Sequence, residues 1–399
     1  MKRIIFLALD FPDIEKSPNL YTDLLCEFQK NGNQVFVVAP SINNEKEAHL
    51  TEDHGIKILR VPTLKLFGGG LIQKGLSNVM LPFQYKKGLK KLKISLNFDV
   101  IIIPTPPITL ITVATWIKKR SKAKLYLILR DIFPQNAVDL RMMSKKGLFY
   151  RYFRKLETKL YREADEIGCM SPENINYIKT HNPSLDFSKL HLLPNWEEFK
   201  LYTEDQNKHK ELRKRYNLGN KVIAIYGGNI GLPQQMENIV ELAEETQDLK
   251  DLVFLIIGWG TEKEKINALA KSKDLSNMLF LENLPRDEYN NILKMADIGL
   301  ISLNKDFTIP NYPSKVNAYY KFKKPVLASV DNNTDFGIMQ ENIGCGLWSH
   351  SGDLKKLKEN LIKLYKDKEL RENMGEKGYQ YMQNNLTPKD AYKTIINKV

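Results

Sequence analysis

The sequence predicts two α/β domains in tandem, each built on a parallel β-sheet covered by helices. Three observations carry this prediction. Short apolar runs of strand length alternate with amphipathic helical segments in both halves of the chain, which favours parallel strands joined by right-handed crossovers. The segment 197–219 between the halves is highly charged and has no apolar period. The 399 residues, with 42% hydrophobic content, suffice for two separate cores.

In the first half, the expected strands are short apolar runs typical of buried parallel strands. They span 4–9, 35–39, 56–61, 100–103, 125–129, 166–170 and 191–193. Helices are expected over 20–30, the later part of 68–96, 108–119 and 147–161. Ser171 followed by Pro172 predicts the start of another helix, because serine caps a first turn and proline fits its first position.

The second half repeats this alternation from residue 220 onward. Its expected strands span 222–226, 252–257, 278–281, 298–301 and 326–328, and helices dominate from 353 to the end. We therefore expect domains over 1–196 and 220–379, with 197–219 as the connection. Ligands of such sheets bind beyond the carboxyl ends of the strands, so the two domains are expected to face each other across a central cleft.

Composition argues against several classes of protein. The three cysteines, Cys26, Cys169 and Cys345, are far apart and odd in number, which disfavours a disulfide framework or a zinc site and favours a reducing cytosol. Prolines interrupt the apolar stretch 101–117, so no membrane-spanning helix is expected. The apolar run after Met1 is too short for a signal peptide.

Positive charge is concentrated in one region. The formal net charge is +13, yet residues 57–162 hold 23 Lys and Arg against 4 Asp and Glu, a surplus of 19 that leaves −6 for the rest. This asymmetry favours an anionic partner for the first half: a membrane surface, a lipid-linked phosphate or nucleic acid.

Two segments of that region interleave basic with large apolar residues, which suits the cytoplasmic face of an anionic membrane. One is the run 86–93, which follows the glycine-rich stretch 67–72, and the other is the helix expected over 147–161. The alternative is a solvated basic face above ordinary core packing.

A glycine loop follows the first strand of the second half. The run Val222–Tyr226 leads directly into Gly227 and then Gly228-Asn229-Ile230-Gly231. Glycines let the backbone approach a ligand closely, and the helix expected from Gln234 would present free N–H groups at its start. We therefore expect the N–H groups of Gly228, Asn229, Ile230 and Gly231 to hold a phosphate, the alternative being a tight turn without a ligand.

Taken in order, the motifs resemble glycosyltransferase family 4, whose members have the GT-B fold of two facing Rossmann-like domains. The chain is most similar to the branch that adds amino sugars such as N-acetylfucosamine in bacterial O-antigen and capsule assembly. The resemblance covers nearly the whole chain and rests on the stretches 129–134, 163–165, 170–172, 193–195, 228–231, 255–260, 296–300 and 312–316. It implies that C-terminal helices, with one at about 380–399, pack back on the N-terminal domain.

The chain departs from the broader family at two charged pairs. An arginine and a lysine usually lie five residues apart on the glycine loop, and here Asn229 and Gln234 take their places. The family's paired glutamates map onto Pro310 and Ala318. The amino-sugar branch often lacks the pair on the loop and carries a Pro-Ser-Lys signature instead, so these departures do not imply an inactive enzyme.

That signature places the expected donor site. Stabilising the charge that develops on a leaving diphosphate is usually the largest catalytic term, and Lys315 is the expected cation, with Ser314 beside it. Trp259 is expected either to stack on the nucleotide or to be a half-buried aromatic residue. The remaining expected donor contacts are Gly258, Gly260, Pro313, Asn317 and Gln234.

Arg130 and Asp131 follow the strand expected over 125–129 and would therefore face the cleft. Asp131 is expected to orient the donor sugar or the acceptor hydroxyl, unless the two residues form an ion pair that fixes a loop.

The resemblance also implies the reaction: retention of anomeric configuration, with the donor phosphate accepting the proton. It implies a UDP-sugar donor, no required cofactor and no metal. It further implies a polyprenyl-diphosphate-linked saccharide acceptor at the inner face of the cytoplasmic membrane.

Two other functions remain open. A sugar-nucleotide epimerase of the same architecture would need carboxylate or histidine acid–base groups, and few lie in matching places. A basic nucleic-acid-binding protein would need a recognition helix or an RNA-binding motif, and none is evident.

Overall fold

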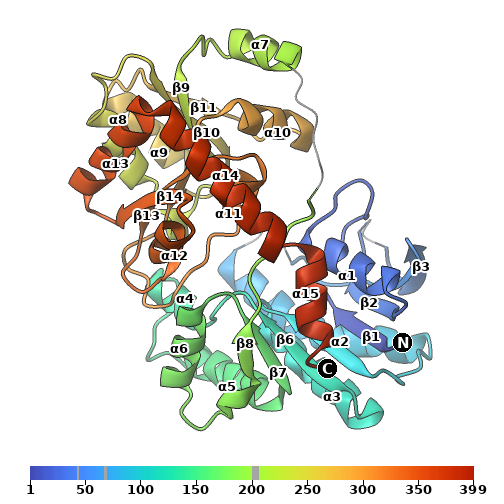
Figure 1. The fold of residues 1–399 in the computed structure, drawn as a ribbon. Coiled ribbons are helices and arrows are strands. Elements are labelled where there is room, and N and C mark those ends of the chain that lie inside the picture. Colours follow the sequence, from blue (N-terminus) through green and yellow to red (C-terminus); the bar gives the residue numbers. More distant parts are fainter. Residues whose placement is uncertain (43–44, 67–69, 200–205) are drawn as a thin grey trace. The chain divides into compact units, whose positions relative to one another are not determined.

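The computed structural model describes residues 1–42, 45–66, 70–199 and 206–399. The chain forms two compact units, Met1–Glu198 with Thr387–Val399, and Phe199–Leu386. Each unit holds one sheet flanked by helices (Figure 1), so the predicted pair of parallel-sheet α/β domains is confirmed. Among the helices described, none is both long enough and apolar enough to cross a membrane.

The sheet of the first unit has eight strands in the order β3-β4-β2-β1-β5-β6-β7-β8. Only β3 runs antiparallel to its neighbour. The strands are β1 (Arg3–Leu7), β2 (Gln34–Pro40), β3 (His49–Asp53), β4 (Ile56–Val61), β5 (Val100–Pro104), β6 (Lys124–Leu129), β7 (Glu166–Cys169) and β8 (Leu190–Leu192).

Helices cover both faces of this sheet. On one face, α1 (Leu20–Lys30) packs beside α15 (Pro388–Ile396), and the rings of Phe28 and Tyr392 lie 4.9 Å apart. On the other face, α2 (Leu71–Lys91) packs against α3 (Ile111–Ser121), which packs against α5 (Leu148–Glu163). The remaining short elements are η1 (Ile108–Leu110), α4 (Gln135–Asp139), α6 (Pro172–His181) and η2 (Phe187–Lys189).

The sheet of the second unit has six parallel strands in the order β11-β10-β9-β12-β13-β14. They are β9 (Val222–Asn229), β10 (Leu252–Trp259), β11 (Met278–Leu281), β12 (Ile298–Ser302), β13 (Val326–Val330) and β14 (Gly346–His350). The helices are α7 (Gln206–Arg215), η3 (Leu232–Gln234), α8 (Glu237–Glu244), α9 (Lys263–Ser272), α10 (Arg286–Met295), α11 (Val316–Lys321), α12 (Phe336–Ile343), α13 (Leu354–Lys366) and α14 (Lys368–Asn385).

The boundaries differ from the sequence expectations in two places. Part of the expected connection 197–219 is helix α7, which buries Leu212 and packs on α10, where Arg213 donates to the carbonyl of Met295 at 3.1 Å. The rest of that connection includes 200–205, which lie outside the described residues. The chain returns to the first unit at Thr387 rather than near 380, because α14 belongs to the second unit through Asn385.

Candidate functional site

The glycine loop is an extension of strand β9. β9 continues to Asn229 instead of ending at Tyr226, because it stays paired with β10 as far as Trp259. Gly228 has φ of +119°, which favours glycine. Gly258 lies against it so closely that a Cβ there would overlap the carbonyl of Gly228. The two glycines therefore let the ends of the strands touch.

Two of the expected phosphate donors are already engaged within the loop. The N–H of Ile230 donates to the carbonyl of Trp259 at 2.7 Å, and the N–H of Gly231 donates to Oε1 of Gln234 at 3.1 Å. The same oxygen accepts from Nδ2 of Asn229 at 3.1 Å. Asn229 and Gln234, at the positions of the family's charged pair, thus form hydrogen bonds within the loop and stabilise its conformation. The expectation that the N–H groups of Ile230 and Gly231 point to a ligand does not hold in this structure.

The helix behind the loop begins later than expected. Residues 232–234 form the 3₁₀ turn η3, Gln235 has a positive φ of 40°, and α8 starts at Glu237. Helix α8 therefore does not begin at Gln234, and no side chain caps its first turn.

Lys315 lies next to the loop with its amine buried. Its Nζ is 3.5 Å from the centroid of the Tyr226 ring and 3.7 Å from the point where a Cβ on Gly228 would lie. Among the described residues, no atom accepts a hydrogen bond from this Nζ. Burial lowers the pKa of Lys315 to about 7. A buried amine without a partner is costly, and an anionic group bound beside Gly228 would relieve that cost.

Tyr226 contacts both the glycine loop and Lys315. Its hydroxyl donates to the carbonyl of Asn229 at 2.6 Å, while its ring carries the amine of Lys315 on its face. From the sequence, Tyr226 is expected only as the end of a strand. The sequence signal for its role is an aromatic residue two positions before the loop, where its side chain shares the carboxyl edge of the sheet.

The loop that ends in Lys315 is held from two directions. Tyr319, on α11, donates to the carbonyl of Leu300 at 3.0 Å and so ties this short helix to the sheet. The hydroxyl of Thr334 donates to the carbonyl of Asn311 at 2.6 Å. Pro313 and Ser314 lie between these anchors, and Asn317 is buried in the first turn of α11. The position of Lys315 is therefore fixed by the fold around it.

The glycine-rich end of strand β10 adds an exposed aromatic residue. Trp259 is 58% exposed and lies in register with Asn229. Gly260 packs on Ile230, where a Cβ would overlap the Ile230 carbonyl. An indole that exposed at the carboxyl edge of the sheet offers a face on which a base can stack.

A hollow on the other side of the loop is acidic. Its volume is about 300 Å³, and its lining includes Glu237, Glu262, Asp306 and Lys305. Lys265 pairs with both glutamates, at 2.7 and 3.2 Å. The hollow therefore offers no surplus of positive charge to a diphosphate, whereas Lys315 offers an amine without an acceptor among the described residues.

Arg130 and Asp131 belong to the first unit. Both backbone N–H groups donate to the hydroxyl of Thr105, at 2.9 and 3.2 Å, just beyond strand β6. The guanidinium of Arg130 lies 5.9 Å from the ring of Trp196, and Asp131 is exposed. The backbone at both positions is thus fixed beyond the carboxyl end of β6.

Of the donor residues expected in the second unit, the structure brings Gly228 against Gly258 and Lys315, and Ile230 against Gly260. Pro313, Ser314 and Asn317 adjoin Lys315 along the chain, in the turn before α11 and in its first turn. Within the described parts of the chain, no group of three or more His, Cys, Asp or Glu side chains could hold a metal ion.

Two family models match the chain. Residues 19–196 match "Glycosyltransferase Family 4", and residues 208–381 match "Glycosyl transferases group 1". Between them, these matches span most of both structural units.

Individual relatives agree with the family models. The chain is 23% identical over 279 residues to the probable glycosyltransferase WbjE of Pseudomonas aeruginosa, covering 69% of this chain and 68% of that protein. It is 25% identical over 227 residues to the putative colanic acid biosynthesis glycosyl transferase WcaI of Escherichia coli (strain K12), covering 56% and 55%. The match therefore spans about half of the length of the second relative.

One solved structure is informative. Anabaena Alr3699/HepE, determined in complex with UDP, is similar over 100% of this chain and 99% of that chain, with a TM-score of 0.68 and 12% identity. At that identity the likeness concerns the fold.

Proposed function

The chain is a glycosyltransferase of family 4 with the GT-B fold, and from this premise we propose that it transfers a sugar from a UDP-sugar to a polyprenyl-diphosphate-linked saccharide. The setting is the assembly of a bacterial surface polysaccharide, capsule or O-antigen. The name of the relative WcaI, a putative colanic acid biosynthesis glycosyl transferase, supports this setting, and the UDP complex of the HepE structure supports the nucleotide.

The observation that carries the proposal is the buried amine of Lys315. It lies beside Gly228, on the face of the Tyr226 ring, with no hydrogen-bond acceptor among the described residues. A diphosphate bound there supplies the missing counter-charge, and Lys315 in turn stabilises the charge that grows on the diphosphate as the glycosidic bond breaks. Trp259 offers its exposed face to the uracil.

The proposed reaction retains the anomeric configuration. The acceptor hydroxyl attacks from the same face as the leaving diphosphate, and a donor phosphate oxygen takes its proton, so no strong protein base is required. Arg130 and Asp131 orient the reacting sugars, and neither a metal nor a cofactor is needed. The transferred sugar is an N-acetylated amino or deoxyamino sugar, as the resemblance to that branch of the family implies.

The acceptor defines where the enzyme works. A polyprenyl-linked saccharide is confined to a membrane, so the enzyme is peripheral on the inner face of the cytoplasmic membrane, and its basic 57–162 region faces the lipid.

A thermal-shift panel with UDP, GDP, CDP and their sugars tests the donor site, because a ligand that binds the native state raises its melting temperature. We expect UDP and UDP-sugars to stabilise the protein. The replacement Lys315→Met removes the charge at similar length and is expected to abolish that shift, whereas the exposed neighbour Lys305→Ala is expected to keep it. A full UDP-sugar response from Lys315→Met would refute the assignment of Lys315.

A further inference from the structure

The outer surface of the layer α2–α3–α5 is strongly basic. These three helices carry 13 Lys and Arg against two Glu, and one of the two, Glu157, is buried. They pack side by side on one face of the sheet. We call their outward surface the basic helix face.

Helix α2 adds an apolar stripe to this face. Leu76, Met80 and Phe83 are 57%, 38% and 53% exposed, and their spacing places them on one side of the helix. The same side continues with Lys87 and Lys90. Exposed aliphatic and aromatic side chains in a row, followed by amines, are typical of a surface that contacts a membrane or another protein.

A hollow opens where the stripe meets the lysines. It measures about 470 Å³ and is lined by Phe83, Lys86, Lys87, Lys90 and Lys91. The amine of Lys91 pairs with Glu47 at 3.3 Å, and that of Lys86 lies 5.3 Å from the Trp116 ring of α3. In the part of the chain that the structure describes, Lys87 and Lys90 form no ion pair. This shallow depression therefore places amines beside the ring of Phe83.

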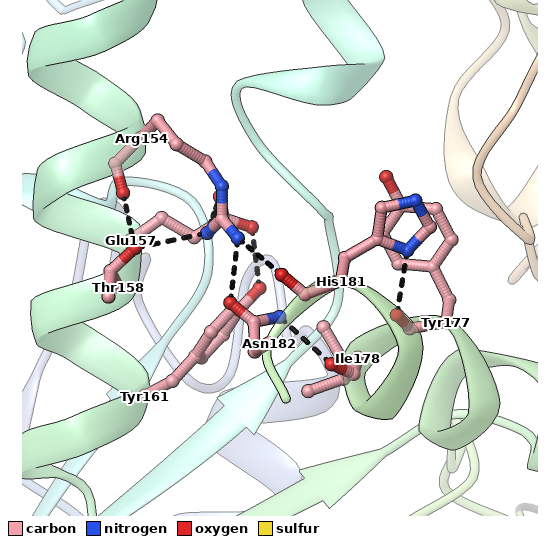
Figure 2. Close-up of polar contacts among 8 residues, drawn as sticks. All are labelled: Arg154, Glu157, Thr158, Tyr161, Tyr177, Ile178, His181 and Asn182. Carbon is pink, nitrogen blue, oxygen red and sulfur yellow. Dashed lines mark hydrogen bonds and ion pairs between the residues drawn. The ribbon is translucent and has the colours of Figure 1, made fainter. Parts of the chain in front are cut away.

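Helix α5 is fixed so that a similar side faces outward. Arg154 donates through Nη2 to the carbonyl of His181 at 2.8 Å and to Oδ1 of Asn182 at 2.7 Å, beside the end of α6 (Figure 2). Its Nη1 donates to the buried carboxylate of Glu157 at 2.9 Å, which also accepts from the Tyr161 hydroxyl at 2.8 Å. These contacts hold the inward side of α5.

The outward side of α5 repeats the pattern of α2. Leu148 and Phe149 are 81% and 76% exposed, and Tyr152 is 46% exposed. Lys155 and Lys159 follow on the same side at helical spacing. Two helices of one layer thus each present large apolar side chains at one end and unpaired amines further along.

We propose that the basic helix face docks on an anionic lipid bilayer: the apolar side chains of α2 and α5 enter the headgroup region, and the lysines and arginines bind lipid phosphates. The proposal localises the membrane contact of the proposed function and depends on that function only for its biological setting. A bilayer fits better than a nucleic acid, because Leu76, Met80 and Leu148 gain from an acyl boundary and gain nothing from a phosphate backbone.

Vesicle flotation of the full chain, without nucleotide, tests the docking surface. The vesicles contain phosphatidylglycerol and phosphatidylethanolamine, and pure phosphatidylcholine is the control. We expect binding to the anionic vesicles only. Lys87→Ala with Lys90→Ala is expected to lower the partition coefficient about 25-fold, or about fivefold for each basic residue near the surface. Phe83→Ser with Phe149→Ser is expected to lower it about tenfold or more.

Matched controls lie on other exposed surfaces. Lys355→Ala with Lys356→Ala, at the start of α13, and Phe187→Ser with Ile338→Ser are expected to bind as the wild type does. All four double variants change exposed residues, so unaltered melting temperatures report intact folding.

Failure of docking and failure of the donor assignment are distinguishable. The α2 and α5 variants are expected to keep the thermal response to UDP-sugars, since none of them touches the loop at Gly228. Failure of the wild-type protein to bind anionic vesicles would overturn the proposal. Binding that is weakened neither by Lys87→Ala with Lys90→Ala nor by Phe83→Ser with Phe149→Ser would overturn it as well. Lysine-dependent binding to a single-stranded RNA, without vesicle binding, would replace the bilayer with a nucleic acid.

Discussion

The lysines of the two units differ in what they face. On the second unit, Lys265 pairs with Glu237 at 2.7 Å, Lys273 with Glu244 at 2.7 Å, and Lys358 with Glu245 at 3.1 Å. On the basic helix face of the first unit, Lys87 and Lys90 form no ion pair among the described residues. These three lysines of the second unit are neutralised within its own fold, whereas no ion pair within the described residues neutralises Lys87 or Lys90.

Lys315 of the second unit differs from these paired lysines. Its amine is buried on an aromatic face and has no hydrogen-bond acceptor among the described residues. The exposed lysines of the basic helix face and the buried amine of Lys315 both indicate anionic ligands. A broad, exposed array of lysines suits an extended anionic surface, whereas a single buried amine suits one bound anionic group. The following predictions test that distinction.

The largest expected effect is on membrane partition. Replacing Lys86, Lys87, Lys90 and Lys91 with alanine is expected to lower vesicle binding by up to about 10³-fold, at about 1 kcal/mol for each basic residue. Hydrolysis of free donor is expected to stay unchanged, since catalysis uses the other unit's loop. Replacing Lys265, Lys273, Lys355 and Lys356 is the matched control. An equal loss of vesicle binding from both sets of substitutions would show that only the net charge matters. It would contradict a specific role of the basic helix face.

Turnover is expected to depend on one buried lysine. Lys315→Ala is expected to lower kcat by about 10²-fold or more, the scale of losing one donor to developing charge. Lys305→Ala, on the acidic hollow nearby, is expected to retain turnover. Steady-state kinetics of the folded variant measures this effect. Normal turnover of Lys315→Ala would contradict a catalytic role of Lys315.

Tyr226 is expected to act by positioning Lys315. Tyr226→Leu removes the ring under the amine and is expected to raise KM for the UDP-sugar about tenfold, within the range of a cation–π contact. Tyr226→Phe keeps the ring and loses only the bond to the Asn229 carbonyl, so its KM is expected to stay closer to the wild type. Identical KM values for both variants would show that the ring does not hold the amine.

The smallest expected effect is on stability. The pKa of Lys315 is about 7 in the folded chain and 10.5 in the unfolded reference, so between these values the unfolded state binds more protons and stability rises with pH. Below pH 7 the full cost of burying the charge is present. Lys315→Met is therefore expected to raise the melting temperature by a few degrees near pH 6 and by less near pH 10. A lower melting temperature for Lys315→Met at pH 6 would contradict this cost.

Periodicity predicted the fold wherever burial shaped the sequence. The runs at 4–9, 100–103 and 252–257 form buried strands, because a continuously apolar strand is stable only where both faces of the sheet are covered. Strand β3 was not predicted, since its residues His49–Asp53 are mostly polar at an exposed edge and depend on a turn at His54 and Gly55, both with positive φ. Helix α7 was missed because one buried residue, Leu212, attaches it.

The candidate site was predictable only in part. Glycines 228, 258 and 260 and the lysine of the Pro-Ser-Lys turn are local signals, and the structure brings them together. The ring of Tyr226 under Lys315 is a contact across 89 positions of sequence that no local pattern reports. The hydrogen bonds that use the N–H groups of Ile230 and Gly231 likewise depend on three-dimensional register.

The most direct test of the account is proton uptake on donor binding, measured by titration calorimetry with a UDP-sugar at pH 8 in buffers of different ionisation enthalpy. Because the amine of Lys315 has a pKa of about 7 without ligand and gains a diphosphate counter-charge on binding, the account predicts net uptake of most of one proton. Lys315→Met is expected to take up none. Binding by the wild type without proton uptake, or the same uptake by Lys315→Met, would contradict the placement of the diphosphate at Lys315.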